Sequence, residues 1–359
     1  MSAAPTFLFI PVSTQKGIGE YIRSTIIAHE IKRCWPDARI EFVLNRHVPY
    51  ADSCEFPVHF VETSPTKHVK EVNRLVSQVK PDVVIFDASG RKAQMEHARR
   101  LGAKVVFISQ HKRKRARGMR IGRALVTDSH WVVQPKFAIG DISLWEKLKL
   151  KLFNCKLPIF TGALFPRPDK AIQQALFDKF QIQAQEYLIY SAGSGGHRDG
   201  DELVVDRFAK AAQEHSAKSG IVSVMVFGPN YPKPLPKLEG VIAIKQLSSF
   251  EFINLLAGAK AAILAGGGTL LQAIALQVPI LAVPVSKDQP RRIKHCVARG
   301  LALTCEADAS AMLAEIDGLL QPQVSAQLRD NMVKEQAQHG LDICMAEITR
   351  LLSERAAKG

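Results

Sequence analysis

The 359-residue sequence has no run of apolar residues approaching the roughly 18 that a membrane-spanning helix needs. Its first ten residues lack a basic segment followed by a long apolar stretch, so the sequence predicts no secretory signal peptide. We therefore expect a cytoplasmic protein, with any membrane contact made peripherally at the cytoplasmic face of the inner membrane.

The six cysteines are scattered along the chain, without a CxxC pair and without a histidine at metal-ligand spacing. This pattern argues against a disulfide scaffold and a zinc site, and it indicates a reducing compartment. No DxD-like pair of carboxylates lies at the end of a predicted strand. We therefore expect neither a metal requirement nor a bound cofactor.

Apolar residues make up 47% of the chain and charged residues 23%, a balance that excludes disorder and collagen-like structure. At roughly 150 residues per domain, the length predicts two domains. Prolines and a glycine make the segment 158–168 the best linker. We therefore place the domains at residues 1–165 and 166–359, with a last helix that could return to the first domain.

The formal net charge of +14 belongs to the first half of the chain. Residues 1–180 hold 30 Lys and Arg against 16 Asp and Glu, whereas residues 181–359 hold 18 of each kind. Net charge bears on partners rather than on fold. The first domain is therefore expected to meet something anionic: nucleic acid, an acidic membrane surface or a phosphorylated acceptor.

Short apolar runs alternate with segments of helical periodicity in both halves. This alternation predicts two doubly wound, Rossmann-like α/β domains, each with a parallel sheet, facing each other across a cleft. The expected strands are 7–12, 39–44, 58–61, 83–86 and 105–108, then 187–191, 222–227, 241–244, 261–264 and 280–283. The expected helices include 20–34, 67–79, 201–217, 269–277, 313–320 and 325–352.

Three glycine-rich loops follow predicted strands. In open α/β sheets ligands bind at the carboxyl ends of strands, where glycine admits a close approach and helix N–H groups attract anionic oxygens. None of the loops has the GK[ST] ending of a P-loop. Each alone is also typical of a tight turn, but three at equivalent positions favour a bound nucleotide. The loops are Gly17-Ile18-Gly19-Glu20, Gly193-Ser194-Gly195-Gly196 and Gly266-Gly267-Gly268-Thr269.

A fourth feature, Asp288-Gln289, lies just beyond the last core strand. Its carboxylate and amide could hold sugar hydroxyls through several hydrogen bonds, or they could belong to an ordinary surface turn before Pro290. With the loop ending in Leu247 and the Gly266–Thr269 loop, this pair makes residues 241–300 resemble the nucleotide-sugar half of GT-B glycosyltransferases. The nearest groups are the peptidoglycan lipid-linked N-acetylglucosaminyltransferases and the UDP-sugar hydrolase of pseudaminic acid synthesis.

The resemblance implies a GT-B fold and assigns roles to individual residues. It implies that the nucleotide base packs on the loop containing Leu247, and that Gln272 holds the ribose where a glutamate is usual. It further implies that the donor sugar lies at Asp288 and Gln289. The donor diphosphate would lie at Gly266, Gly267, Gly268 and Thr269, and the loop Ser194, Gly195 and Gly196 would match the one that opens the second domain.

The N-terminal loop is similar to the GxGHxxR motif of the same families, with Glu20 in place of the histidine. The resemblance implies that Gly17 and Gly19 bind the donor and that Glu20 is the catalytic base, provided that burial makes its carboxylate basic enough. A carboxylate in the first turn is equally what a helix dipole favours. Asp87, after the strand 83–86, is the second candidate for the base.

Two segments of the first domain are candidates for contact with an acceptor or a membrane. Residues 111–123 follow a predicted strand and contain seven Lys and Arg without an acid; residues 144–157 mix Trp145 and leucines with lysines. The second pattern suits an anionic bilayer interface, although a solvated loop or a core-facing helix would also fit. Without interleaved aromatics, nucleic acid is not expected. The candidate residues are Lys112, Arg113, Lys114, Arg115, Arg117, Arg120 and Trp145.

These features predict a metal-independent hexosyl- or N-acetylhexosaminyltransferase of cell envelope biosynthesis. Its donor would be a nucleotide-sugar, expected to be UDP-linked, and its acceptor an anionic, lipid-linked or lipopolysaccharide-type glycan. A nucleotide-sugar hydrolase of the same fold is the alternative. A basic binding protein that retains an inert fold is the third hypothesis.

Overall fold

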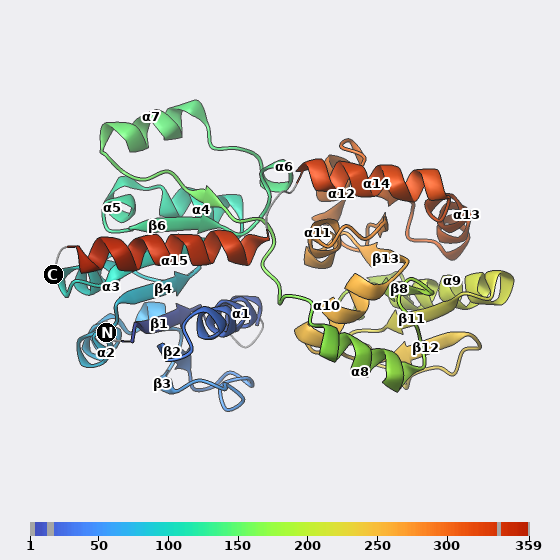
Figure 1. Cartoon of the computed structure of the whole chain (residues 1–359), viewed down its shortest axis with the longest axis horizontal. Coiled ribbons are helices and arrows are strands. Elements are labelled where there is room, and N and C mark those ends of the chain that lie inside the picture. The colour runs from blue at the N-terminus through green and yellow to red at the C-terminus, as the bar shows by residue number, and fades with distance from the viewer. Residues whose placement is uncertain (1–3, 13–17, 336–338, 358–359) are drawn as a thin grey trace. The chain divides into compact units, whose positions relative to one another are not determined.

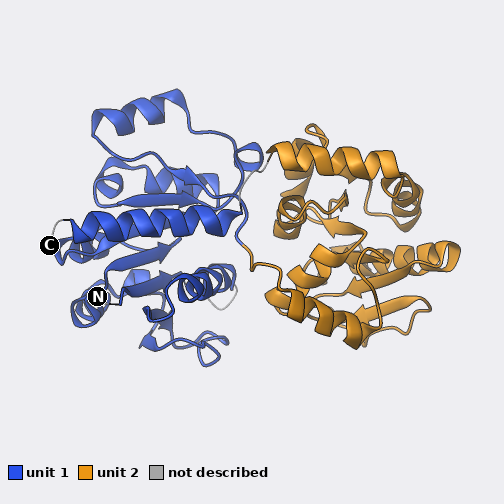
Figure 2. Ribbon diagram, viewed as in Figure 1, with its two compact units in different colours: residues 1–164, 338–359 blue, residues 165–337 orange. Residues whose placement is uncertain are grey.

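The computed structural model describes residues 4–12, 18–335 and 339–357. The chain divides into two compact units, coloured separately in Figure 2. Unit 1 comprises residues 1–164 and 338–359, and unit 2 comprises residues 165–337. The division follows Leu164, one residue before the boundary expected from the sequence, and the C-terminal helix belongs to unit 1.

Unit 1 is built, in its described part, on a seven-stranded sheet of order β3-β2-β1-β4-β5-β6-β7, in which every neighbouring pair is parallel (Figure 1). The strands are β1 (Thr6–Pro11), β2 (Arg39–Asn45), β3 (Val58–Val61), β4 (Val83–Asp87), β5 (Lys104–Ser109), β6 (Ser129–Val132) and β7 (Ile159–Phe160). The helices are α1 (Gly19–Cys34), η1 (Pro65–Lys67), α2 (Val69–Val79), α3 (Lys92–Arg100), α4 (Lys112–Gly118), α5 (Ile121–Ala124), α6 (Lys136–Ile139), α7 (Leu144–Leu152) and α15 (Gly340–Ala356).

Both faces of this sheet are covered, which explains why its central strands are apolar almost throughout. Along β1, Phe7 and Phe9 join the core beneath α1 and α15, whereas Leu8 and Ile10 join the core beneath α2 and α3. This alternation follows from the two-residue period of a strand. Unit 1 is therefore a three-layer α/β unit whose loops gather at the ends of the strands.

Helix α15 completes the core of unit 1, although it comes from the end of the chain. Ile348 and Leu351 are fully buried in the same core as Phe7 and Phe9, and the helix packs against α1 and β5. Near its end, the Glu354 carboxylate accepts hydrogen bonds from Lys104 at 3.1 Å and from Lys156 at 3.2 Å, and one from Arg350.

Unit 2 contains a second parallel sheet, of order β12-β11-β8-β13-β14-β15, and a small antiparallel hairpin of β9 and β10. The strands are β8 (Tyr187–Ser191), β9 (Arg198–Asp199), β10 (Glu202–Leu203), β11 (Val222–Val226), β12 (Val241–Ile244), β13 (Ala261–Ala265), β14 (Ile280–Val283) and β15 (Leu303–Thr304). The helices are α8 (Lys170–Phe180), α9 (Val204–Ser219), α10 (Ser249–Gly258), α11 (Gly268–Ala275), α12 (Gln289–Val297), α13 (Ala309–Leu319) and α14 (Pro322–Glu335).

The expected fold class is confirmed: each unit is a doubly wound α/β structure around a parallel sheet. Three local expectations change. The first residues of the supposed linker form the edge strand β7, and the hairpin of β9 and β10 separates the second glycine loop from α9. The expected helical segment 325–352 is two helices, α14 in unit 2 and α15 in unit 1.

No helix within the described ranges is long and apolar enough to cross a membrane.

The Glu354 contacts give a testable pH dependence. Burial raises the pKa of this carboxyl, but the hydrogen bonds from Lys104, Lys156 and Arg350 outweigh it and lower the pKa from 4.5 to about 2. The resulting stabilisation is present above about pH 4.5 and is lost as the pH falls towards 2. We expect Glu354→Gln to lower the free energy of unfolding at neutral pH by about 0.5–1 kcal/mol, because solvent screens this exposed network.

Urea unfolding near pH 7 and near pH 3 measures this effect, and the difference between variant and parent should shrink at the lower pH. Glu186→Gln is the matched control, since Glu186 is exposed and its side chain makes no ion pair in the described part of the chain. An equal difference at both pH values would contradict the assignment.

Candidate functional site

In unit 2, the start of α11 is open to a ligand at the carboxyl end of β13. Its N-cap, Gly267, makes no side-chain cap hydrogen bond. A Cβ added at Gly267 or Gly268 would meet no atom within 4 Å. The first N–H groups of a helix lack intrahelical partners and carry partial positive charge. This end of α11 can therefore receive an anionic group such as a phosphate.

The loops after β13 and β14 are held together by Gln289. This side chain is buried, and its Oε1 accepts hydrogen bonds from the N–H groups of Gly266 at 3.1 Å and Val285 at 2.9 Å. From the next turn of α12, Arg292 donates to the carbonyl of Gly266. The side-chain oxygen of Gln289 therefore holds the two loops together, a role that differs from the sugar contact expected for this residue.

The other expected donor-binding side chains lie around the same edge of the unit 2 sheet. Asp288, between β14 and α12, is exposed and accepts a hydrogen bond from Ser286 at 2.7 Å. Thr269 and Gln272 are half-buried on the first turns of α11, and Leu247 is half-buried between β12 and α10. Asp288 is thus placed to accept hydroxyl hydrogen bonds.

The loop after β8 is tightly packed at Gly195. Gly195 has a φ of +81°, and a Cβ there would lie 2.0 Å from the carbonyl oxygen of Phe227. The carbonyl of the neighbouring Ser194 accepts a hydrogen bond from the N–H of Asn230 at 2.8 Å. The need for glycine at Gly195 is thus explained by packing on the β11–β12 loop, while Ser194 is half-buried and Gly196 is exposed.

In unit 1, a buried ion pair joins α1 to the carboxyl end of β4. The Arg23 Nε donates to one oxygen of Asp87 at 2.8 Å and its Nη2 to the other at 2.6 Å, while Nη1 donates to Gln110 at 3.1 Å. Ser24 also reaches the Asp87 carboxylate at 3.5 Å. Asp87 is fully buried, and Arg23 nearly so.

Burial and charge act in opposite directions on this pair. Burial raises the pKa of Asp87 to about 6, against the lowering effect of Arg23. For Arg23, burial opposes the charge, but the attraction of Asp87 and its hydrogen bonds prevail and raise the pKa of the guanidinium. Because both oxygens of Asp87 face Arg23, the geometry argues against the expected role of Asp87 as an alternative base. Asp87 instead positions Arg23.

Glu20 lies one turn before Arg23 and is half-buried in the first turn of α1. Its charge favours the charged forms of Arg23 and Lys114 and disfavours ionisation of Asp87, so these four groups share one electrostatic environment. Gly19 begins the helix, and a Cβ there would meet nothing within 4 Å. The predicted donor contact Gly17 lies outside the described residues.

The basic segment forms α4 and α5, beyond the carboxyl end of β5, and one of its arginines turns inwards. Arg115 is 6% exposed, donates to the carbonyl groups of Gly140 and Asp141, and lies over the Phe160 ring at 5.7 Å. Burial lowers the pKa of this guanidinium. Arg115 therefore holds the segment in place and is unsuited to the acceptor or membrane contact expected for it.

The remaining cations gather near the ends of β4 and β5. Lys114 donates to the carbonyl of Ala88 at 2.9 Å, and Arg123 to that of Gly90 at 2.6 Å. Burial lowers the pKa of both groups, and so does repulsion from Arg117; Arg91 and Arg120 add to it at Arg123. We call Arg91, Lys114, Arg117, Arg120 and Arg123 the cationic cluster.

The other expected contacts of this segment, Lys112 and Arg113, are exposed on α4. Within the described residues, no side-chain ion pair is formed by Lys112, Arg113, Arg117 or Arg120. These four cations are therefore available to an anionic partner.

Three functional candidates were not predicted from the sequence. Arg23 is the last residue of the segment similar to GxGHxxR, and the motif gives it no role. Arg91 lies outside the basic segment 111–123, and Arg292 is one of two adjacent arginines. A usable signal existed for Arg292, because it follows Asp288 by four residues in a helix and therefore lies on the same face. For Arg23, nothing in the sequence linked it to Asp87, which is 64 residues away.

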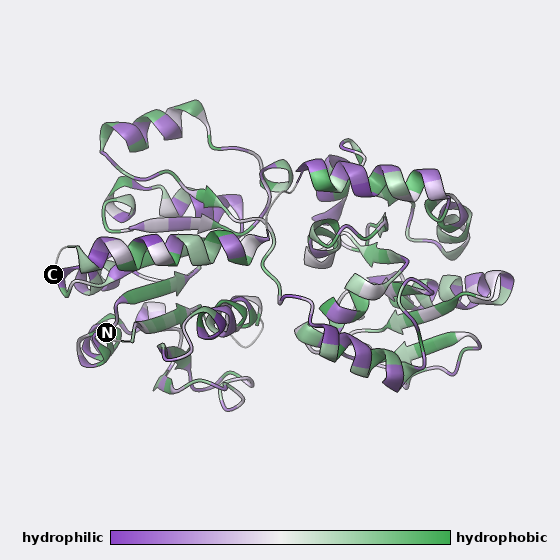
Figure 3. Cartoon of the chain, viewed as in Figure 1, coloured by the Kyte–Doolittle hydropathy of each residue, from purple (hydrophilic) through white to green (hydrophobic). Residues whose placement is uncertain are grey.

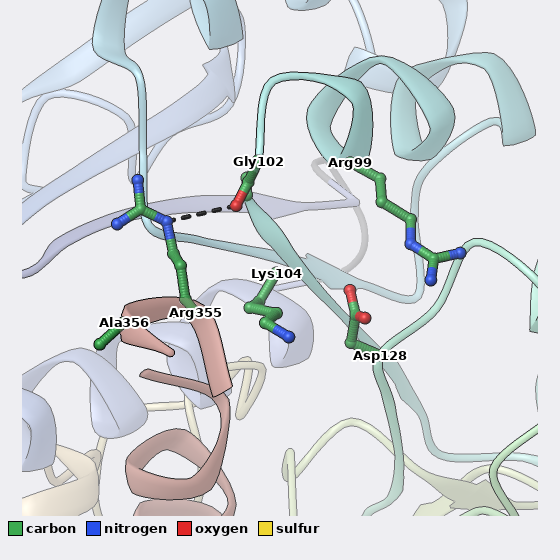
Figure 4. A pocket seen from close by; sticks show the side chains of 7 residues that line it. Arg99, Gly102, Lys104, Asp128, Arg355 and Ala356 are labelled. Atoms are coloured by element: carbon green, nitrogen blue, oxygen red, sulfur yellow. Dashed lines mark hydrogen bonds between the residues drawn. The ribbon is translucent and has the colours of Figure 1, made fainter. Parts of the chain in front are cut away.

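A cavity of about 540 Å³ lies at the opposite, amino end of β5 and is drawn in Figure 4. Its charged groups already have partners: Arg355 donates to Gly102 and forms an ion pair with Asp82, and Lys104 binds Glu354. Asp128 accepts from the N–H of Val105, and Arg99 donates to the carbonyl of Leu125. This cavity therefore belongs to the anchoring of α15. Across the described residues, no group of three His, Cys, Asp or Glu side chains could hold a metal ion.

No family model and no curated protein matches the chain. Solved structures do. The glycosyltransferase VinC, in complex with dTDP, has a TM-score of 0.66 at 14% identity over 97% of this chain and 100% of that one. The calicheamicin glycosyltransferase CalG4 has a TM-score of 0.59 at 14% identity over 98% and 99%. The UDP-GlcNAc 2-epimerase from Neisseria meningitidis, bound to UDP-GlcNAc, has one of 0.56 at 14% over 96% and 100%.

Together with the two parallel sheets, these similarities show that the chain has the GT-B fold.

The buried pair of Arg23 and Asp87 predicts a strong coupling between the two side chains. Removing one partner leaves an uncompensated buried charge, so Arg23→Ala and Asp87→Ala should each lower the free energy of unfolding by about 3–5 kcal/mol. The double variant should lose clearly less than the sum. Urea unfolding of unit 1, followed by tryptophan fluorescence, measures the cycle, because all three tryptophans, Trp35, Trp131 and Trp145, lie in this unit. Additive losses would show that the two groups are uncoupled.

Proposed function

We propose that this protein is a metal-independent glycosyltransferase that uses a nucleotide-sugar donor, with UDP as the nucleotide. The observation that carries the proposal is the uncapped start of α11, where Gly267 and Gly268 leave open space beside the carboxyl ends of β13 and β14. A diphosphate suits this end of the helix because its N–H groups and dipole stabilise negative charge.

Neighbouring side chains supply contacts for the rest of the donor. In this proposal the exposed Asp288, between β14 and α12, accepts hydrogen bonds from the sugar hydroxyls. Gln272, one turn into α11, binds the ribose. Leu247 offers apolar surface for the base. Two of the structural neighbours are complexes with dTDP and with UDP-GlcNAc, which supports a nucleotide-diphosphate ligand of this general kind.

The chemical step divides into two tasks. An acceptor hydroxyl attacks the anomeric carbon of the sugar and loses its proton to Glu20, the base in this proposal. The bond between the anomeric carbon and the diphosphate breaks, and the N–H groups of α11 stabilise the charge that develops on the departing oxygen. Preorganised dipoles of this kind are commonly the largest catalytic contribution.

The proposed acceptor is an anionic glycan, lipid-linked or of the lipopolysaccharide type, bound through unit 1. The cationic cluster supports this choice, because Lys114 and Arg123 are held among like charges whose repulsion an anionic group would relieve. A place at the cytoplasmic face of the inner membrane, in cell envelope biosynthesis, follows from such an acceptor. A small soluble substrate would need no cluster of this size, which favours transfer over hydrolysis.

Nucleotide binding is tested by thermal-shift measurement with UDP, GDP, ADP, CMP and dTDP. A nucleotide present at 100 times its Kd stabilises the folded protein by about 2.7 kcal/mol, and we expect UDP to give the largest shift. Gly268→Asp should weaken UDP binding about tenfold or more through charge repulsion. The fold should survive, since a carboxylate is favoured at a helix start.

The matched control is Gln277→Asp, which adds the same charge beyond the other end of α11, at a φ of +58° that aspartate tolerates. It should leave the UDP shift unchanged. If no nucleotide shifts the melting temperature, or if Gly268→Asp binds UDP like the parent, the donor assignment is wrong. UDP release from a UDP-sugar at full rate without an acceptor would identify a hydrolase.

Acceptor binding is tested by neutralising two residues of the cationic cluster, the half-buried Arg117 and the exposed Arg120. Arg117→Gln/Arg120→Gln should raise the KM for an anionic acceptor by about 100-fold or more, because each of the two charge-assisted contacts contributes about 1.5–3 kcal/mol. The thermal shift with UDP should not change, since these residues belong to unit 1. An unchanged KM would exclude the cluster as the acceptor site.

A further inference from the structure

Helix α7 exposes an apolar stripe that the core of unit 1 does not use. Leu144 is 83% exposed, Trp145 72%, Leu148 58% and Leu152 78%. The one buried residue of the helix is Leu150, which packs in a small cluster with Met119 and Ile142. Bulky apolar groups seldom form a contiguous exposed patch without a binding role.

The stripe is continuous because of its spacing. Leu144, Leu148 and Leu152 recur every four residues and Trp145 adjoins them, so at 3.6 residues per turn the four side chains span about 100° of the helix surface. Leu150 falls on roughly the opposite side. Helix α7 therefore turns one narrow side to unit 1 and its apolar side outwards, and Figure 3 shows apolar and polar residues alternating along it.

Lysines border the stripe on both sides. At the same 100° per residue, Lys147 and Lys151 lie along one margin and Lys149 along the other. Lys147 is ion-paired with Asp141 at 2.9 Å, which leaves Lys149 and Lys151 for an anionic surface. A hollow of about 410 Å³ adjoins the first margin and is lined by Lys147, Lys151, Leu148 and Leu157, with Asn154 and Cys155. It pairs cationic groups with apolar walls, as a lipid headgroup and the start of its acyl chain require.

We propose that α7 is an interfacial helix that lies in the plane of an anionic bilayer leaflet, with its leucines and Trp145 among the upper acyl chains and its lysines against lipid phosphates. An apolar face flanked by lysines, with an aromatic residue at the boundary, has the chemistry of such helices. A second copy of the chain fits less well. Pairing two such faces would bring the lysine margins of both helices together, and each helix has a single acid, Glu146, to offset their repulsion.

This inference deepens the proposed function by giving a membrane-side acceptor a physical route to the enzyme, but vesicle binding needs no sugar transfer. The full chain is sedimented with vesicles of phosphatidylcholine alone or mixed with phosphatidylglycerol. We expect binding to the mixed vesicles, weakened by salt. Of the three tryptophans, Trp145 is exposed, Trp35 half-buried and Trp131 fully buried. Insertion of Trp145 should therefore shift the tryptophan emission to shorter wavelength.

Two variants separate the apolar and the cationic contributions. Leu148→Glu/Leu152→Glu should abolish vesicle binding, and Lys149→Gln/Lys151→Gln should lower the partition coefficient about 30-fold at low salt. Val333→Glu is the matched control, because Val333 is an exposed apolar residue on α14 of unit 2, and it should bind like the parent.

Absence of binding to the mixed vesicles, or binding of Leu148→Glu/Leu152→Glu at the parental level, would overturn the proposal. So would self-association that this variant removes while vesicle binding is absent, which would identify the face as an interface between copies. The UDP thermal shift of each variant keeps the two proposals apart. If UDP does not shift the melting temperature of the parent, the donor site is wrong, whereas the vesicle result is unaffected.

Discussion

The strands of each large sheet run in one direction, and the positions of the candidate residues follow from this constraint. In a parallel sheet all carboxyl ends lie at one edge, where chain segments far apart in sequence meet. In unit 1 this edge joins Arg23 to Asp87 across 64 residues. In unit 2 it joins Gly266 to Gln289 and Arg292. At the amino edge of the unit 1 sheet, Lys104 and Asp82 bind Glu354 and Arg355 at the end of α15.

Strands that are buried on both faces could be predicted from the sequence, because short, continuous apolar runs such as those of β4 and β13 are typical of a parallel sheet covered by helices on both sides. Strand β6 escaped prediction since it begins with Ser129 and His130. These side chains are tolerated in the core because Ser129 donates to Glu347 and His130 bonds with Ser109. Both partnerships are tertiary, so no local pattern reveals them. Burial lowers the pKa of His130 to about 3, and the ring is neutral at physiological pH.

The candidate site was predictable as a set of loops but not as a set of roles. Glycine after a strand marks the start of α11 correctly. At Gly195 the same signal has another cause, because the carbonyl of Phe227 leaves no room for a Cβ. A run of seven Lys and Arg does not reveal that Arg115 turns inwards over Phe160 while Arg117 stays among other cations. Whether a side chain stabilises the fold or remains available to a ligand depends on tertiary contacts, which composition and spacing do not encode.

The return of α15 has a consequence for biosynthesis. Residues 165–337 are inserted between the two parts of unit 1, so the ribosome completes unit 2 before it supplies Ile348 and Leu351. Until then α1 lacks its packing partner α15, and the core that Ile27 and Ile31 share with β1 and β2 stays incomplete. Unit 1 therefore completes its core only after unit 2 has been synthesised. During this interval the incomplete core of unit 1 is a binding site for a chaperone that recognises apolar surfaces.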